Sequence, residues 1–113
     1  MLFRSGHHLW LTSESSPTKG PGTIYEADPA TGAVLWTTTV PGPIPGSPSL
    51  DGSGVLAASS YATGGSTYLL DSSTGALLAT VNTNSQEFAQ PVYAGRYLFL
   101  ATEQSGLIAY RAP

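Results

Sequence analysis

The sequence lacks cysteine and is poor in charge. Its 113 residues contain no Cys, four Lys or Arg and seven Asp or Glu, which gives a formal net charge of -3. Without Cys, the chain cannot form disulfides, thiolate nucleophiles or Cys-based zinc sites. Four scattered cations cannot neutralise a row of phosphates, so we expect no nucleic-acid partner.

Long apolar segments are also missing. No apolar run approaches the roughly 20 residues that a membrane helix needs, so we expect no membrane span. The first ten residues include Arg4, Ser5 and Gly6 and lack the apolar stretch of a secretory signal. The sequence therefore predicts no signal peptide, and by itself it indicates no compartment.

Small and turn-forming residues are abundant. The chain has 13 Gly and 9 Pro together with many Ser and Thr, a composition that disfavours a helix bundle. Hydrophobic residues make up 41%, which is too much for a disordered tail. The composition therefore predicts a turn-rich, all-β fold.

An internal repeat organises the chain. Residues 23–35 align with residues 66–78 at a constant offset of 43, and a partial third copy covers 98–110. A repeat of about 40–45 residues with four short strands is typical of one blade of a β-propeller. The residues to which we assign a structural role in the repeat are Asp28, Thr31 and Gly32 in the first copy and Asp71, Thr74 and Gly75 in the second.

The alternation of apolar and polar residues predicts roughly ten strands in antiparallel hairpins, because the linkers are too short for helical crossovers. We expect strands at 7–13, 22–28, 33–40, 46–50, 54–62, 66–71, 76–82, 88–93, 96–102 and 106–111. We therefore predict that residues 1–113 form a single incomplete propeller segment of about two and a half four-stranded blades. These are a partial blade at about 7–45, a full blade at 46–87 and a partial blade at 88–113.

The Asp-x-x-Thr-Gly segments have a mechanical explanation. The carboxylate of Asp28 or Asp71 can accept N–H groups of the following turn. Gly32 or Gly75 can then take the positive φ of a type I turn with a G1 bulge. The alternative is that the two aspartates are metal ligands or catalytic bases, and their equivalent places in a repeat favour the turn.

The segment from Tyr25 to Trp36 resembles the repeat of pyrroloquinoline-quinone (PQQ)-type propellers, quinoproteins in which Asp-x-x-Thr-Gly is followed by a Trp. The stretches 47–52 and 90–95 resemble the Ser-Pro strand that precedes this repeat. The resemblance implies that Trp36 docks between neighbouring blades. The second copy has Ala79 at the equivalent place, so we expect the seam beside the second blade to be looser.

Few side chains suggest chemistry. His7 and His8 are adjacent and would point to opposite faces of a strand, which makes a poor chelate and favours a partly exposed place at a strand start. The sequence predicts solvated surface charges for Glu14, Glu26, Glu87 and Glu103, although strand ends could bring Glu87 and Glu103 together around a propeller axis.

The serines and glycines lack catalytic motifs. Ser13, Ser59 and Ser60 are not in a Gly-x-Ser-x-Gly elbow, and the segment 51–54 is typical of a hairpin turn. Tyr61 is a candidate for a polar contact. We predict no catalytic residue, no cofactor-binding residue and no metal site.

The resemblance implies two functions. Quinoprotein dehydrogenases hold a quinone and a calcium ion on the propeller axis, and none of their ligand motifs is recognisable here. We therefore expect no cofactor and a non-catalytic segment of a longer propeller, acting as a protein-binding or scaffold module. The alternative is a fragment of a PQQ-dependent dehydrogenase whose cofactor site lies on other blades.

The expected partners follow from the incomplete ring. Closed propellers have 4–8 blades, so the remaining blades of a parent chain, a further copy of this chain or another protein would cover the open ends. An extracytoplasmic location follows from the family resemblance only.

Overall fold

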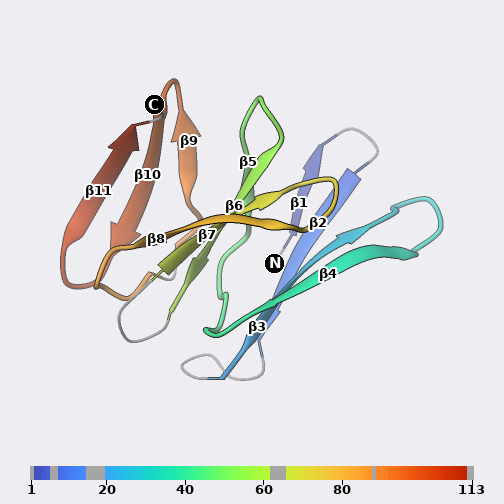
Figure 1. The fold of residues 1–113 in the computed structure, drawn as a ribbon, viewed down its shortest axis with the longest axis horizontal. Coiled ribbons are helices and arrows are strands. Elements are labelled where there is room, and N and C mark those ends of the chain that lie inside the picture. The colour runs from blue at the N-terminus through green and yellow to red at the C-terminus, as the bar shows by residue number, and fades with distance from the viewer. Residues whose placement is uncertain (1, 6–7, 15–19, 62–65, 88, 112–113) are drawn as a thin grey trace.

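The chain folds into three antiparallel β-sheets (Figure 1). The computed structural model describes residues 2–5, 8–14, 20–61, 66–87 and 89–111, with the side chains of 2–5 left undescribed. The strands are β1 (Leu2–Ser5), β2 (His8–Glu14), β3 (Gly22–Ala27), β4 (Val34–Val40), β5 (Ser49–Leu50), β6 (Val55–Ser60), β7 (Ser66–Asp71), β8 (Leu77–Asn82), β9 (Val92–Ala94), β10 (Tyr97–Thr102) and β11 (Gly106–Arg111).

The sheets follow the chain in order, with strand orders β1-β2-β3-β4, β5-β6-β7-β8 and β11-β10-β9. The all-β, antiparallel prediction is confirmed. Strand β1 was not predicted, because the 43-residue offset from β5 would place the first strand at 6–7 rather than at 2–5. The strands expected at 46–50 and 88–93 are shorter than predicted, since Pro48 and Pro91 lack the N–H that a ladder needs.

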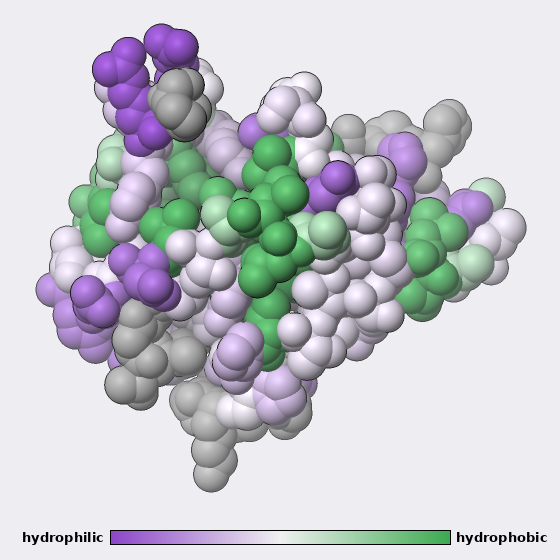
Figure 2. Space-filling view, in the orientation of Figure 1, coloured by the Kyte–Doolittle hydropathy of each residue, from purple (hydrophilic) through white to green (hydrophobic). Residues whose placement is uncertain are grey.

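The middle sheet is covered on both faces. In β6, every residue from Leu56 to Ser60 is buried, so this strand is a continuous run of apolar and small residues rather than an alternation. Strands β4 and β8 are the outer edges of their sheets and are mostly exposed. Figure 2 shows the hydrophobic residues of one face in separate green patches, between which the surface is pale or purple.

The two Asp-x-x-Thr-Gly turns have the same geometry. Gly32 and Gly75 have φ of 76° and 78°, and each donates its N–H to the carbonyl oxygen of Asp28 or Asp71 at 2.7 or 2.8 Å. The Asp28 carboxylate accepts the Ala30 N–H, and that of Asp71 accepts the Ser73 N–H and hydroxyl. These Ser73 hydrogen bonds, the hydroxyl first, lower the pKa of Asp71.

The described residues contain no helix that is long and apolar enough to cross a membrane.

Candidate functional site

Two seams join the sheets. The first seam lies between the β1–β4 and β5–β8 sheets, and the second lies between the β5–β8 and β9–β11 sheets. The core of the first seam consists of Trp10, Ile24, Val40, Ile44, Leu56, Ala58, Tyr68 and Leu70. The smaller core of the second consists of Ala57, Leu98 and Leu100, with Leu69, Val81, Tyr93 and Tyr110 packed against it.

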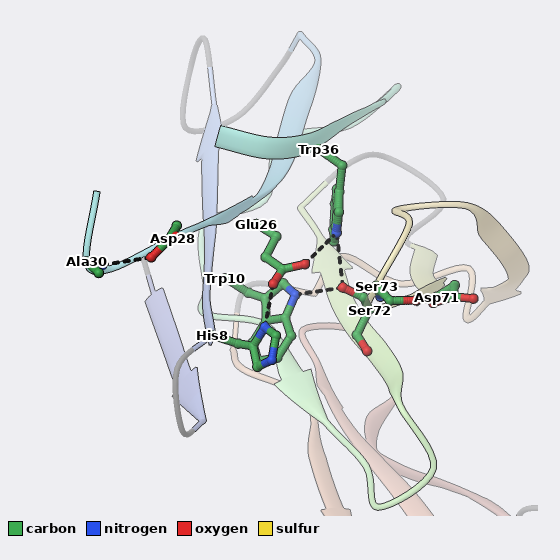
Figure 3. Close-up of polar contacts among 9 residues, drawn as sticks. All are labelled: His8, Trp10, Glu26, Asp28, Ala30, Trp36, Asp71, Ser72 and Ser73. Atoms are coloured by element: carbon green, nitrogen blue, oxygen red, sulfur yellow. Dashed lines mark hydrogen bonds and ion pairs between the residues drawn. The ribbon is translucent and has the colours of Figure 1, made fainter. Parts of the chain in front are cut away.

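Trp36 connects the first sheet to the second (Figure 3). Its indole N–H lies 3.0 Å from both the Ser72 carbonyl oxygen and Glu26 Oε1. The ring lies so close to Gly75 that a Cβ there would overlap it. Trp10 donates its own indole N–H to the same Ser72 oxygen at 3.1 Å. The turn of the second sheet is thus held by two tryptophans of the first.

Glu26 is buried between these indoles, with 3% of its surface exposed. Its Oε2 lies 2.6 Å from Nδ1 of His8, whose ring stacks on Trp10 at 5.5 Å (Figure 3). The prediction of a solvated surface charge at Glu26 was wrong. Strand register places Glu26 between Trp10 and Trp36, where indole N–H and imidazole groups replace water.

His8 has the partly exposed place at a strand start that the sequence predicts, with 59% of its side chain exposed at the first residue of β2. His7 lies outside the described residues.

The second seam reverses the polarity of the first. We call the end of a seam beside the Asp-x-x-Thr-Gly turns its outer end and the opposite end its inner end. At its outer end, strand register places Ala57, Leu69 and Ala79 where the first seam has Trp10, Glu26 and Trp36. At its inner end, the 43-residue offset places Thr67, Thr83 and Glu87 where the first seam has Ile24, Val40 and Ile44. The first seam is therefore polar at its outer end and apolar at its inner end, and the second seam has the opposite arrangement.

Glu87 is the centre of the polar inner end. It is 1% exposed, and its carboxylate accepts hydrogen bonds from the hydroxyls of Thr67 and Thr83. Ser59 bonds to Thr67 at 2.9 Å, and Ser60 is buried with its hydroxyl unpaired among the described residues. The prediction of a solvated Glu87 was also wrong, because its carboxylate meets the Thr83 hydroxyl four residues away and the Thr67 hydroxyl of β7, which is 20 residues away in the sequence.

The structure does not pair Glu87 with Glu103. The Glu103 carboxylate is exposed and accepts the hydroxyl of Tyr61 at 3.2 Å. Burial and then this hydrogen bond raise the pKa of Tyr61, which thus makes a polar contact as expected. Ser13 is at the surface, bonded to Tyr25, and Glu14 is exposed as predicted. Within the described residues, no three His, Asp or Glu gather closely enough to hold a metal ion.

Each seam contains a cavity at its outer end. The cavity of the first seam has about 430 Å³ and is lined by His8, Trp10, Glu26, Leu35, Leu50, Ser72 and Ser73. The cavity of the second has about 390 Å³ and is lined by Asp51, Val55, Leu69, Val81, Tyr93, Gly95, Arg96, Tyr97, Leu98, Tyr110 and Arg111. The expected loosening of the second seam thus does not show as a larger cavity, and what differs is the chemistry of the lining.

The sequence analysis did not predict that Trp10, Glu26 and Ser72 lie together in one cluster. Trp10 falls outside the 43-residue offset, so only strand pairing with Glu26 identifies it. Sequence reasoning also missed Arg96 and Arg111, although these two of the four basic residues of the chain lie together at the open end of one predicted hairpin.

Comparisons with known proteins agree with this architecture. A family profile described as outer membrane protein assembly factor BamB matches residues 5–112. The crystal structure of BamB from Moraxella catarrhalis is similar, with 19% identity and a TM-score of 0.75 over 98% of this chain and 31% of that chain. No curated protein sequence matches the chain.

Two computationally designed proteins are also similar in structure. Ika4 has 12% identity and a TM-score of 0.76 over 99% of this chain and 64% of its own. Ika8 has 12% identity and a TM-score of 0.74 over 97% of this chain and 32% of its own. The predicted all-β partial propeller is confirmed, and the chain spans about a third of the length of the Moraxella protein. At these identities, the likeness to solved structures shows the fold alone.

Proposed function

The chain belongs to the BamB family of PQQ-like repeat propellers, and from that premise we propose that it is a non-catalytic propeller segment that binds an extended polypeptide strand. The observation that carries this proposal is the edge of β11. Strands β3 and β7, which hold the third place in their sheets, are paired on both sides. Strand β11 holds the same place and, among the described residues, pairs only with β10.

An unpaired strand edge favours strand addition. Its free N–H and C=O groups form a template along which another extended segment can pair. Residues 106–111 of β11 form this template, and Leu107 within it is 70% exposed. The partner strand would take the place that β4 and β8 have in the other sheets. Such a strand can come from further blades of a parent chain, from another protein or from a second copy.

The alternative is a fragment of a PQQ-dependent dehydrogenase whose cofactor site lies on other blades, and a free buried carboxylate in this chain, suited to calcium, would support it. The two buried carboxylates of the described residues do not fit that role. Glu26 is enclosed by the donors of Trp36 and His8, and Glu87 by those of Thr67 and Thr83. Each lies in a separate seam, so we derive no step through a quinone.

A peptide tests the proposed function. A synthetic peptide with the sequence of residues 76–83, which contains β8, supplies a fourth strand of this family's own pattern. We expect it to bind the chain and to slow amide hydrogen exchange at alternate residues of β11. A peptide of the same sequence with alternate amides N-methylated cannot pair and is the matched control. Equal binding of both peptides, or binding without protection of β11, would contradict the proposal.

A further inference from the structure

The cavity of the second seam, here called the seam pocket, combines an apolar interior with a cationic rim. Val55, Leu69 and Val81 of the middle sheet are half-buried, and Leu98 of the third sheet is buried. Arg96 and Arg111 line the same cavity and are exposed. The volume of about 390 Å³ lies within the roughly 300–1,000 Å³ of small-molecule sites.

Positive charge exceeds negative charge at the rim of the seam pocket. Arg96 and Arg111 are half of the four basic residues in a chain of net charge -3. Neither forms an ion pair with a described carboxylate. Asp51 also lines the cavity, but its carboxylate accepts the N–H and hydroxyl of Ser53 and the N–H of Val55. This carboxylate still places one negative charge at the cavity, so the two guanidinium groups leave a net positive charge of one for an anion.

Three tyrosines complete the lining. Tyr93, Tyr97 and Tyr110 give the pocket aromatic surface as well as hydroxyl groups. Burial, followed by the charge of Asp51, raises the pKa of Tyr93 to about 12. A tyrosine hydroxyl is protonated at neutral pH and can donate a hydrogen bond to an anionic or carbonyl oxygen.

The first seam shows what distinguishes this pocket. At equivalent places, the first seam has His8 and Glu26 where the seam pocket has Val55 and Leu69. In the first seam, the buried carboxylate is already satisfied by His8 and Trp36. The seam pocket has no such internal pair, so its apolar walls are free to contact a ligand.

We propose that the seam pocket binds a small organic acid, whose aromatic or aliphatic body packs against Leu69 and whose anionic group lies between Arg96 and Arg111. Apolar area removed from water would supply most of the affinity. The guanidinium groups would select the anion, because charge-assisted hydrogen bonds from Arg are about twice as strong as neutral ones. The inference is independent of strand addition at β11.

Two probes of the same shape separate these contributions. 2-Naphthoate carries a negative charge, and 2-naphthamide is its neutral counterpart. In titrations of the chain followed by NMR, we expect naphthoate to bind about tenfold more tightly than naphthamide. The shifted amides should belong to residues of the seam pocket. Equal affinities, no binding of either probe, or shifts centred on the first seam would overturn the proposal.

Charge variants test the rim directly. Arg96→Gln and Arg111→Gln should each weaken naphthoate about threefold and leave naphthamide unchanged. Arg4→Gln removes the same charge on β1 of the first sheet and should leave both affinities unchanged. A loss of naphthoate binding in all three variants would show a non-specific effect of net charge and contradict the proposal.

A filling variant tests the interior. Leu69→Trp should block both probes by occupying the space. Since this variant can disturb folding, the exposed Arg96 and Arg111 variants are decisive on their own: unchanged naphthoate affinity in both would overturn the role of the rim.

Discussion

At the scale of the residue, Trp36 is the side chain on which the first seam depends most. It packs against Gly75, and its indole N–H donates hydrogen bonds to the Ser72 carbonyl oxygen and to Glu26. We expect Trp36→Ala to lower the free energy of unfolding by about 3–5 kcal/mol, toward the lower end because the indole is only half-buried. Urea unfolding followed by circular dichroism measures this change.

Trp36→Phe serves as its control. This variant keeps a ring over Gly75 and removes the indole N–H. We expect a loss of about 1–2 kcal/mol because Glu26 Oε1 loses this donor, whereas the Ser72 oxygen keeps that of Trp10. A loss below about 1 kcal/mol for Trp36→Ala would mean that the indole does not hold the two sheets together.

At the scale of the element, the two Asp-x-x-Thr-Gly turns form a natural matched pair. Gly32 and Gly75 have nearly the same positive φ, but a Cβ at Gly32 meets no atom within 4 Å, whereas one at Gly75 meets the Trp36 ring. We expect Gly32→Ala to cost about 1–2 kcal/mol of stability from backbone strain alone. Gly75→Ala should cost about 1–3 kcal/mol more, because the added methyl group overpacks the seam.

The Trp36→Ala background separates strain from crowding. In that background, most of the extra cost of Gly75→Ala should disappear while the cost of Gly32→Ala persists. A part of the extra cost remains, because the Thr38 hydroxyl oxygen also lies 2.7 Å from the added Cβ. Equal losses for the two glycine variants in the wild-type background would show that Gly75 is required for its conformation only.

The sequence was sufficient for what is local or repeated. Alternation and turn chemistry predicted ten of the strands, and the 43-residue offset predicted the two equivalent turns. It did not predict β1, which lies off that offset, or the burial of Glu26 and Glu87. The burial of an acid depends on which donors the neighbouring strands and sheets bring to it, and a reading of single strands contains no such information.

At the scale of the whole molecule, the two seams have a buried carboxylate at opposite ends. The first has its carboxylate at the outer end, at Glu26, and the second has its carboxylate at the inner end, at Glu87. A buried carboxylate is tolerated only with its donors in place. The three sheets are therefore joined by two different polar clusters, and substitutions that disturb one cluster should leave the other intact.

Replacing the polar cluster of the second seam by apolar residues tests this dependence on donors. Thr67→Val with Thr83→Val removes the hydroxyls that donate to Glu87 and leaves a buried charge without them. We expect this pair to cost about 3–5 kcal/mol in the free energy of unfolding. Adding Glu87→Ile, which copies Ile44 of the first seam, should restore most of the loss, since apolar replacement of a whole buried polar cluster is often neutral. The exposed pair Thr37→Val with Thr39→Val is the matched control and should change stability by less than about 0.5 kcal/mol. If the triple variant were less stable than the double, Glu87 would stabilise the second seam through contacts other than those two hydroxyls.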